Sequence, residues 1–217
     1  MLKKYLPKIA LGLLIIAIVA LIALGILVHY HSVFKLDLFL SRDLQGEGDT
    51  PERKALILNF LLFVSFFGKA FVTAAMVFIT AAIFYLYKFY REVIFIIITP
   101  IAAGVNALVK LIVDRPRPSD NLISIIDREL DPSFPSGHVN FYVVFFGLLI
   151  AIMLSQQKIP LIFRFLSIGF SLIMIVSVSF SRIYLGAHWA TDVLGGYLLG
   201  FILLSILLYF YFRPTSR

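Results

Sequence analysis

The chain has 217 residues, of which 61% are hydrophobic and only 14% are charged, and its mean hydropathy is +0.99. This composition excludes a soluble globular domain and indicates a protein that resides in a lipid bilayer. The lack of cysteine excludes disulfides, thiolate nucleophiles and cysteine-ligated metals. The formal net charge of +7 is scattered between apolar runs and does not form the basic stripe typical of nucleic-acid binding.

The chain divides into apolar runs, several of which approach the length of about 20 residues that a membrane-spanning helix needs. The first, residues 5–28, has a longer apolar core than a cleavable signal peptide, so we interpret it as a span. Residues 29–52 are expected to form a polar loop. Residues 51–67 are apolar but too short to span comfortably, and we expect an interfacial or re-entrant helix there. The later spans are expected at residues 70–87, 93–111, 138–154, 162–180 and 189–212.

We therefore expect an all-α polytopic membrane protein, in which six transmembrane helices form a bundle and a single domain over residues 1–217. The charges assign its orientation. In this arrangement one face of the membrane holds nine Lys and Arg residues and one acid, whereas the other holds ten basic residues and eleven acids. Short cytoplasmic loops are rich in Lys and Arg, so both termini are expected on the cytoplasmic side of the plasma membrane.

Three short polar segments occur in the second half of the chain, each at the edge of an apolar run. They are Lys110–Pro118, Pro135–His138 and Ser181–Asp192. The expected orientation places all three at the extracytoplasmic face, and charge at such positions is costly unless it has a function. If the residues after Gly186 are helical, His188 and Asp192 lie on one face. The carboxylate can then orient the imidazole and leave its other nitrogen basic.

Cations in these segments suit the binding of a phosphate group, because Lys110, Arg117 and Arg182 can neutralise its oxygens. The ordinary alternative is that they bind lipid headgroups, as interfacial basic residues often do. We assign that role to Arg115, or a pairing with the adjacent Asp114.

The second polar segment supplies a turn and a histidine. Ser136 and Gly137 precede the helix expected from His138, and backbone N–H groups at the start of a helix bind anions. We therefore expect Ser136 and the Gly137 N–H to bind phosphoryl oxygens. Ser136 as a nucleophile is the competing hypothesis. We reject it because no acid–base pair is reserved for that hydroxyl.

The order and spacing of the three segments resemble a known signature. It consists of Lys110 followed after six residues by Arg117-Pro118, then Pro135-Ser136-Gly137-His138, then Ser181-Arg182 with five residues to His188 and three more to Asp192. This pattern is similar to that of the type 2 phosphatidic acid phosphatases. The hydrophobic layout agrees with their integral-membrane lipid phosphatase branch, and within it with the bacterial phosphatidylglycerophosphatases.

The resemblance implies a division of labour between two histidines. His188 is expected to attack phosphorus and form a phosphohistidine, Asp192 to fix its tautomer, and His138 to protonate the leaving alkoxide. No carboxylate cluster suited to magnesium accompanies the motifs, so we expect neither a metal nor another cofactor. The expected activity is hydrolysis of a phosphate monoester or pyrophosphate on a membrane lipid.

The motifs recognise only the phosphate group, so they do not identify the lipid that carries it. Candidates are phosphatidylglycerophosphate, phosphatidic acid, diacylglycerol pyrophosphate and undecaprenyl pyrophosphate, and selectivity is expected to come from the loop Asp120–Asp131 and from clefts between spans. Two other functions are compatible with the same residues. One is phosphotransfer to a second lipid, and the other is non-enzymatic binding of lipid headgroups. Neither nucleic acid nor an obligatory protein partner is expected.

Overall fold

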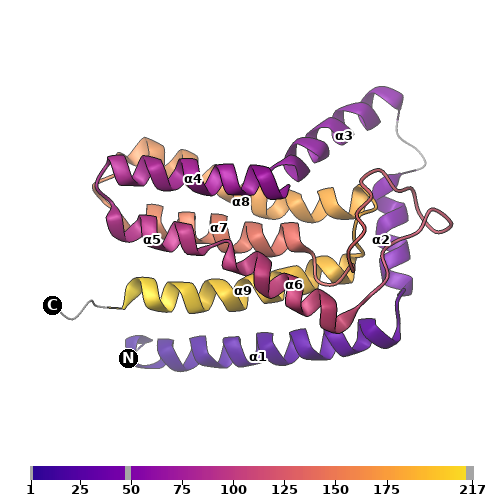
Figure 1. The fold of residues 1–217 in the computed structure, drawn as a ribbon, viewed down its shortest axis with the longest axis horizontal. Helices are drawn as coiled ribbons and strands as arrows, with labels where there is room; N and C mark the ends of the chain where they lie inside the picture. Colours follow the sequence, from indigo (N-terminus) through magenta and orange to yellow (C-terminus); the bar gives the residue numbers. More distant parts are fainter. Residues whose placement is uncertain (1, 47–49, 214–217) are drawn as a thin grey trace.

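The computed structural model describes residues 2–46 and 50–213, with side chains from Ile9 onward, and all regular structure in these residues is helical (Figure 1). This confirms the all-α prediction. The helices are α1 Leu2–Tyr30, α2 Lys35–Gln45, α3 Pro51–Phe66, α4 Ala70–Leu86, α5 Tyr90–Ile98, α6 Ile101–Val113, α7 Gly137–Ser155, α8 Leu161–Tyr184 and α9 Ala190–Phe212.

Five segments of the described chain are individually long and apolar enough to cross a membrane. They are Ile9–Tyr30, Tyr90–Val113, Gly137–Ser155, Leu161–Tyr184 and Ala190–Phe212. A sixth span results if α3 and α4 count as one broken helix, whose two parts differ in direction by 64°. Figure 1 shows α3 leaning away from the bundle while α4 runs alongside it. The expected six spans agree with the structure when α3 and α4 are counted as one broken span, and the sharp bend between them is compatible with the re-entrant helix expected near residues 51–67.

The helix α7 is the centre of the bundle. Of its most apolar 18-residue stretch, 61% is buried, compared with 17% for α1 and α8. Its ring of aromatic side chains, including Tyr142, Phe145 and Phe146, packs in the main hydrophobic core. The helices α8 and α9 pack most closely against it, and α6 and α5 cover other parts of its surface.

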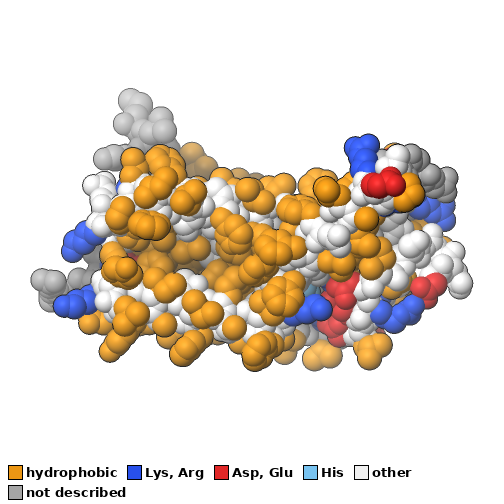
Figure 2. All heavy atoms as spheres, turned by 90° about the horizontal axis from the view of Figure 1, so that it is seen from above, with side chains coloured by type: hydrophobic (Ala, Val, Ile, Leu, Met, Phe, Trp, Pro, Cys, Tyr) orange, Lys and Arg blue, Asp and Glu red, His pale blue; other side chains and the backbone are white. Residues whose placement is uncertain are grey.

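The outer surface of the bundle is apolar, as a bilayer requires. Figure 2 shows a broad band of hydrophobic side chains between the two ends, with Lys and Arg gathered at one end and a mixture of acidic and basic side chains at the other. Large side chains such as Ile16, Phe78 and Phe165 are more than half exposed there. In water this surface would be a liability, whereas lipid chains cover it without cost.

Two helical details differ from the prediction. The polar loop expected at residues 29–52 contains α2, which runs across the end of the bundle, almost perpendicular to α1 (Figure 1). The span expected at residues 93–111 is divided into α5 and α6 at Thr99-Pro100. Proline lacks an N–H and disfavours helical conformation in the residue before it, so a break at this point is expected physically.

Candidate active site

The three polar segments meet at one end of the bundle, opposite the end where α1 begins and α9 finishes (Figure 1). Lys110 lies in the last turn of α6 and Arg182 in the last turn of α8, while His138 lies in the first turn of α7. Because neighbouring spans run in opposite directions, ends that are distant in sequence come together. The predicted convergence of the motifs is therefore confirmed as geometry.

A tight turn carries the chain from α8 to α9 and places His188. Gly186 in this turn has a φ of +68°, a left-handed conformation that favours glycine, and a Cβ there would lie 2.3 Å from the carbonyl oxygen of Ser124. The N–H groups of Ala187 and His188 both donate to the carbonyl oxygen of Arg182. The turn thus holds His188 next to the end of α8 that carries Arg182.

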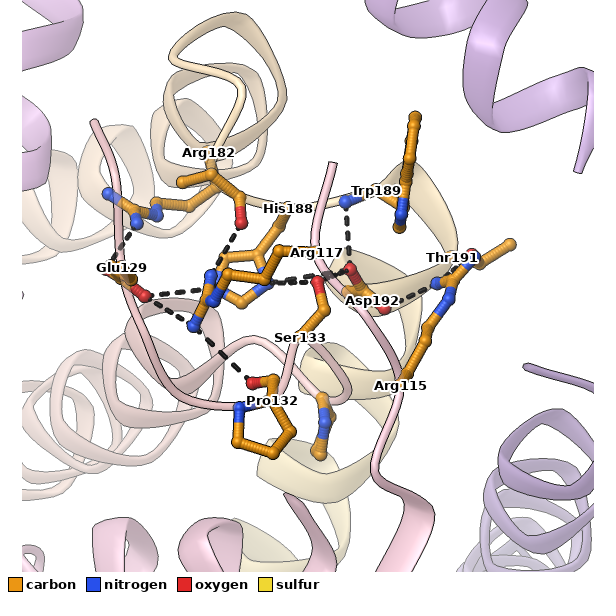
Figure 3. A network of polar contacts seen from close by, with 12 residues as sticks. Arg115, Arg117, Glu129, Pro132, Ser133, Arg182, His188, Trp189, Thr191 and Asp192 are labelled. Atoms are coloured by element: carbon orange, nitrogen blue, oxygen red, sulfur yellow. Dashed lines mark hydrogen bonds and ion pairs between the residues drawn. The ribbon is translucent and has the colours of Figure 1, made fainter. Parts of the chain in front are cut away.

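His188 is almost completely buried and lies between a carboxylate and an arginine (Figure 3). Its Nδ1 is 3.6 Å from Oδ2 of Asp192, and its Nε2 is 3.3 Å from a guanidinium nitrogen of Arg117. The helix expected after Gly186 begins only at Ala190, so His188 precedes the helix and does not share its face with Asp192. The predicted approach of the two side chains occurs nevertheless, through the turn.

Asp192 is held by donors on every side. Oδ2 accepts the backbone N–H of Trp189 at 2.8 Å and the Ser133 hydroxyl at 2.5 Å, and Oδ1 accepts from Arg115. The carboxylate and the Arg115 guanidinium are both fully buried. Such a carboxylate is fixed in orientation, which is what a side chain that positions a histidine needs.

The role predicted for Arg115 is wrong. Its guanidinium is fully buried and bridges Asp192 and Asp37, the latter at 2.7 Å on α2. It also donates to the hydroxyl of Thr191 and to the carbonyl oxygen of Ser32. A headgroup contact or a pairing with Asp114 would need an exposed side chain, whereas this one is enclosed between two carboxylates.

The three predicted phosphate-binding cations come together, and carboxylates from the loop between α6 and α7 face them. Lys110 Nζ is 2.6 Å from Asp131, which also pairs with Arg117 at 2.7 Å. Asp127 lies 2.8 Å from Arg182. Glu129 bridges Arg117 at 2.7 Å and Arg182 at 2.6 Å. The three cations are therefore paired with acidic side chains of the chain itself, and Lys110, Glu129 and Asp131 line a common pocket.

His138 faces the same pocket from the first turn of α7. Its Nδ1 lies 3.9 Å from one oxygen of Glu129, and Nε2 of His188 lies 3.8 Å from the other. The ring fits against Gly68, in the break between α3 and α4, where a Cβ would come within 1.9 Å of it. The two histidines thus face a common carboxylate. That they face each other across a phosphate stays a prediction.

The two residues of the predicted Ser136-Gly137 turn lie in different surroundings. Ser136 is fully buried, and its N–H donates to the backbone oxygen of Asp192 at 3.0 Å, so that N–H is engaged within the fold. Gly137 is the first residue of α7 and lines the same cavity as Lys110 and His138. Phosphate binding by the Gly137 N–H and by the Ser136 hydroxyl stays a prediction.

The electrostatics favour a neutral His188 and an ionised Asp131. Burial, followed by the charges of Arg117, Arg182 and Lys110, lowers the pKa of His188 well below its usual value. Burial tends to raise the pKa of Asp131, but its hydrogen bond and charge interaction with Lys110 and those with Arg117 outweigh this and hold the pKa at about 2. At neutral pH the imidazole is therefore uncharged, and Asp131 is ionised.

The match to a family model decides which family the chain belongs to. The model described as PAP2 superfamily matches residues 89–216, more than half of the chain and all eight predicted site residues. The chain belongs to the PAP2 superfamily. The predicted resemblance is confirmed.

Individual PAP2 relatives agree. The chain is 30% identical over 139 residues to phosphatidylglycerophosphatase B of Bacillus subtilis (strain 168), covering 63% of this chain and 66% of the relative. It is 34% identical over 94 residues to the bacitracin transport permease protein BcrC of Bacillus licheniformis, covering 43% of this chain and 40% of that one. An undecaprenyl-diphosphatase of Sulfolobus acidocaldarius is 34% identical to the chain over 73 residues, which cover 34% of this chain and 31% of the relative. The chain thus spans just under two thirds, or less, of these relatives.

A solved PAP2 structure shares the fold. A transmembrane PAP2-type phosphatidylglycerolphosphate phosphatase from Bacillus subtilis superposes with a TM-score of 0.77 at 20% identity, covering 91% of this chain and 94% of that one. Because the superposition extends beyond residues 89–216, it includes helices that the PAP2 family model omits. Asp37 on α2 and Ser65 on α3, which contact Arg115 and Arg182, lie in this amino-terminal part.

Proposed function

We propose that this PAP2 protein is a lipid phosphatase that removes a terminal phosphate through a phosphohistidine intermediate. The observation that carries the proposal is the position of the Glu129 carboxylate. Two arginines bind it, and Nε2 of His188 lies within 4 Å of it (Figure 3). Nδ1 of His138 also lies within 4 Å of it. A phosphoryl group in the same place would meet fixed positive charge, a nucleophilic nitrogen on one side and a proton donor on the other.

In the first step, the lone pair on Nε2 of His188 forms a bond to phosphorus as the bond from phosphorus to the lipid oxygen breaks. His138 gives its proton to that departing alkoxide. Asp192 lies beside Nδ1 of His188, so it keeps the proton on that nitrogen and stabilises the charge that develops on the ring. Arg117 and Arg182 offset the charge on the phosphoryl oxygens.

In the second step, water attacks the phosphohistidine on phosphorus. His138, which is now unprotonated, takes a proton from this water, and the bond between phosphorus and Nε2 breaks. Orthophosphate leaves, and both histidines return to their starting protonation states. The cycle consumes one lipid phosphate and one water molecule, so the net reaction is a hydrolysis.

A lipid substrate fits the surroundings of the site. A cavity of about 370 Å³ has a polar part lined by Lys110, His138, Glu129, Asp131 and Asn106. Its other lining residues are mostly small or apolar and come from α4, α6, α7 and the breaks before α4 and α6. It shares Ala74 and Pro100 with a second, almost wholly apolar hollow along α4 and α5. A phosphate bound at His138 can therefore have its hydrocarbon chain along an apolar surface that faces the membrane.

The proposal is tested by phosphate release from detergent-solubilised lipids. The panel comprises phosphatidylglycerophosphate, phosphatidic acid, diacylglycerol pyrophosphate and undecaprenyl pyrophosphate, each assayed with and without excess EDTA. We expect release from at least one lipid and no loss of rate in EDTA, because three cationic side chains supply the positive charge that a metal would otherwise provide. Loss of activity in EDTA that magnesium or zinc restores would contradict the metal-independent mechanism.

We further propose that the site faces the extracytoplasmic side. The support is the distribution of charge, because the segments at the opposite end hold nine basic residues and only one acid. A reporter inserted after residue 125, in the loop next to the site, is expected to be active outside the cytoplasm, and one fused to either terminus inside it. A cytoplasmic signal at residue 125 would reverse the orientation.

A further inference from the structure

The loop between α6 and α7 places a carboxylate where the proposed mechanism needs a phosphate. One oxygen of Glu129 lies 2.6 Å from Arg182 and 3.9 Å from His138, and the other lies 2.7 Å from Arg117 and 3.8 Å from His188. Each oxygen thus meets one arginine and one histidine. A planar anion held by two guanidinium groups in this way reproduces the contacts expected for two phosphoryl oxygens.

The conformation of the loop explains how Glu129 reaches the site. From Asp127 to Asp131 the backbone has no regular secondary structure and bends at both ends. Asp127, Glu129 and Asp131 all face the cations, whereas Leu130 between them is 96% exposed. This short stretch can shift without uncovering any hydrophobic core.

Glu129 can leave the site while the rest of the loop stays in place. Backbone hydrogen bonds hold the segment at both sides, from Asp127 N–H to the carbonyl oxygen of Leu185 and from Ser133 N–H to that of Arg115. Arg182 keeps Asp127 as a partner, and Arg117 keeps Asp131. Neither arginine would be left as an unpaired buried charge, so displacement of the Glu129 carboxylate does not carry that large cost.

We infer that Glu129 is an intramolecular ligand of the phosphate site, which substrate displaces on binding and which displaces orthophosphate after the reaction. This inference rests on the proposed function, because it assigns to the phosphate site a residue that sets the affinity of this site for phosphate. An anion tethered to the site competes with every phosphate at a high effective concentration. It weakens binding of substrate and product by one common factor and thereby shortens the time for which product occupies the site.

The test is the substitution Glu129→Gln, which keeps the shape of the side chain and removes its charge. If the carboxylate fills the site nine-tenths of the time, its loss strengthens phosphate binding by about tenfold. We expect KM for a lipid phosphate to fall about tenfold, and the inhibition constant of orthophosphate to fall by the same factor. The turnover number kcat should stay equal or decrease as product release slows. Glu129→Ala should change both constants in the same direction.

Asp120 offers a matched control in the same loop. It pairs with Arg128 at 2.5 Å, and both side chains are more than 60% exposed, away from the histidines. Asp120→Asn removes the same charge from the loop and should leave KM and the inhibition constant unchanged. If Glu129→Gln lowers kcat by a hundredfold or more at constant KM, Glu129 takes part in the chemistry and the inference is wrong. Unchanged affinity for orthophosphate would also overturn it.

A binding measurement separates this inference from the proposed function. Titration calorimetry of orthophosphate with the full-length protein in detergent needs no turnover. Should no variant release phosphate from any lipid, the proposed function fails while the ratio of orthophosphate affinities still tests Glu129. Should the unmodified protein be active but bind orthophosphate as tightly as Glu129→Gln does, the function stands and the inference falls.

Discussion

Replacing His188 with alanine is expected to abolish phosphate release from every substrate, whatever its leaving group. His188 supplies the nitrogen that forms the covalent bond to phosphorus, and no leaving group can replace a missing nucleophile. The measurement compares a lipid phosphate with nitrophenyl phosphate, and rapid acid-free quenching should trap labelled phosphohistidine only in the unmodified protein. A thermal unfolding scan in detergent checks that the variant is folded.

His138→Ala is the informative comparison, because its loss should depend on the substrate. Without a proton donor the lipid alkoxide is a poor leaving group, and the rate should fall by roughly 10²- to 10⁴-fold. Nitrophenolate is stable as an anion, so its release should slow much less. Equal losses on the two substrates, or a phosphohistidine at position 138, would show that the roles of the two histidines are reversed or shared.

Arg115→Leu is expected to be the most destabilising single substitution at this end of the bundle. It removes the cation between Asp37 and Asp192 and leaves two fully buried carboxylates without their ion-pair partner. Breaking a buried ion pair in this way costs about 3–5 kcal/mol of the free energy of unfolding. Activity should fall as well, since Asp192 loses one of the donors that orient it. Thermal and denaturant unfolding in detergent provide the measurement.

The chain contains its own control for this effect. Arg128 forms an ion pair of similar length with Asp120, but both partners are largely exposed. Exposed pairs contribute about 0–1 kcal/mol, so Arg128→Leu should change stability very little. Adding Asp37→Asn to Arg115→Leu should restore part of the lost stability by removing one unpaired carboxylate, a non-additive result. Similar losses for Arg115→Leu and Arg128→Leu would contradict the role assigned to the buried cation.

Much of the architecture follows from the sequence because membrane helices carry a strong and local signal. Every expected span coincides within a few residues with a helix of the structure, although the third is divided at Thr99-Pro100 and the second passes the length test only together with α3. The short helix α2 was missed because it is eleven residues long and lies in a segment rich in charge. Its helical conformation depends on contacts with distant residues, such as that from Asp37 to Arg115, which no local pattern reveals.

In the site, too, local sequence patterns predict some features, whereas others depend on tertiary contacts. The spacing of the motifs was enough to predict that Lys110, Arg117 and the two histidines belong to one site. The burial of Arg115 could not be predicted, because an arginine in a proline-containing loop usually lies at the surface. Glu129 was missed for a similar reason, since a loop carboxylate is normally solvated. The acidic residues at alternate positions, Asp127, Glu129 and Asp131, were the available signal.

The bond network around Asp37 has a consequence for the order in which the protein can mature. Asp37 is synthesised early, yet its partners Arg115 and Thr191 follow 78 and 154 positions later. Until α9 has entered the bilayer, this carboxylate has no complete set of donors, and water must serve in their place. We expect α2 to stay at the membrane surface during synthesis and to dock last. A nascent chain would then become competent to bind phosphate only after its final helix has been delivered.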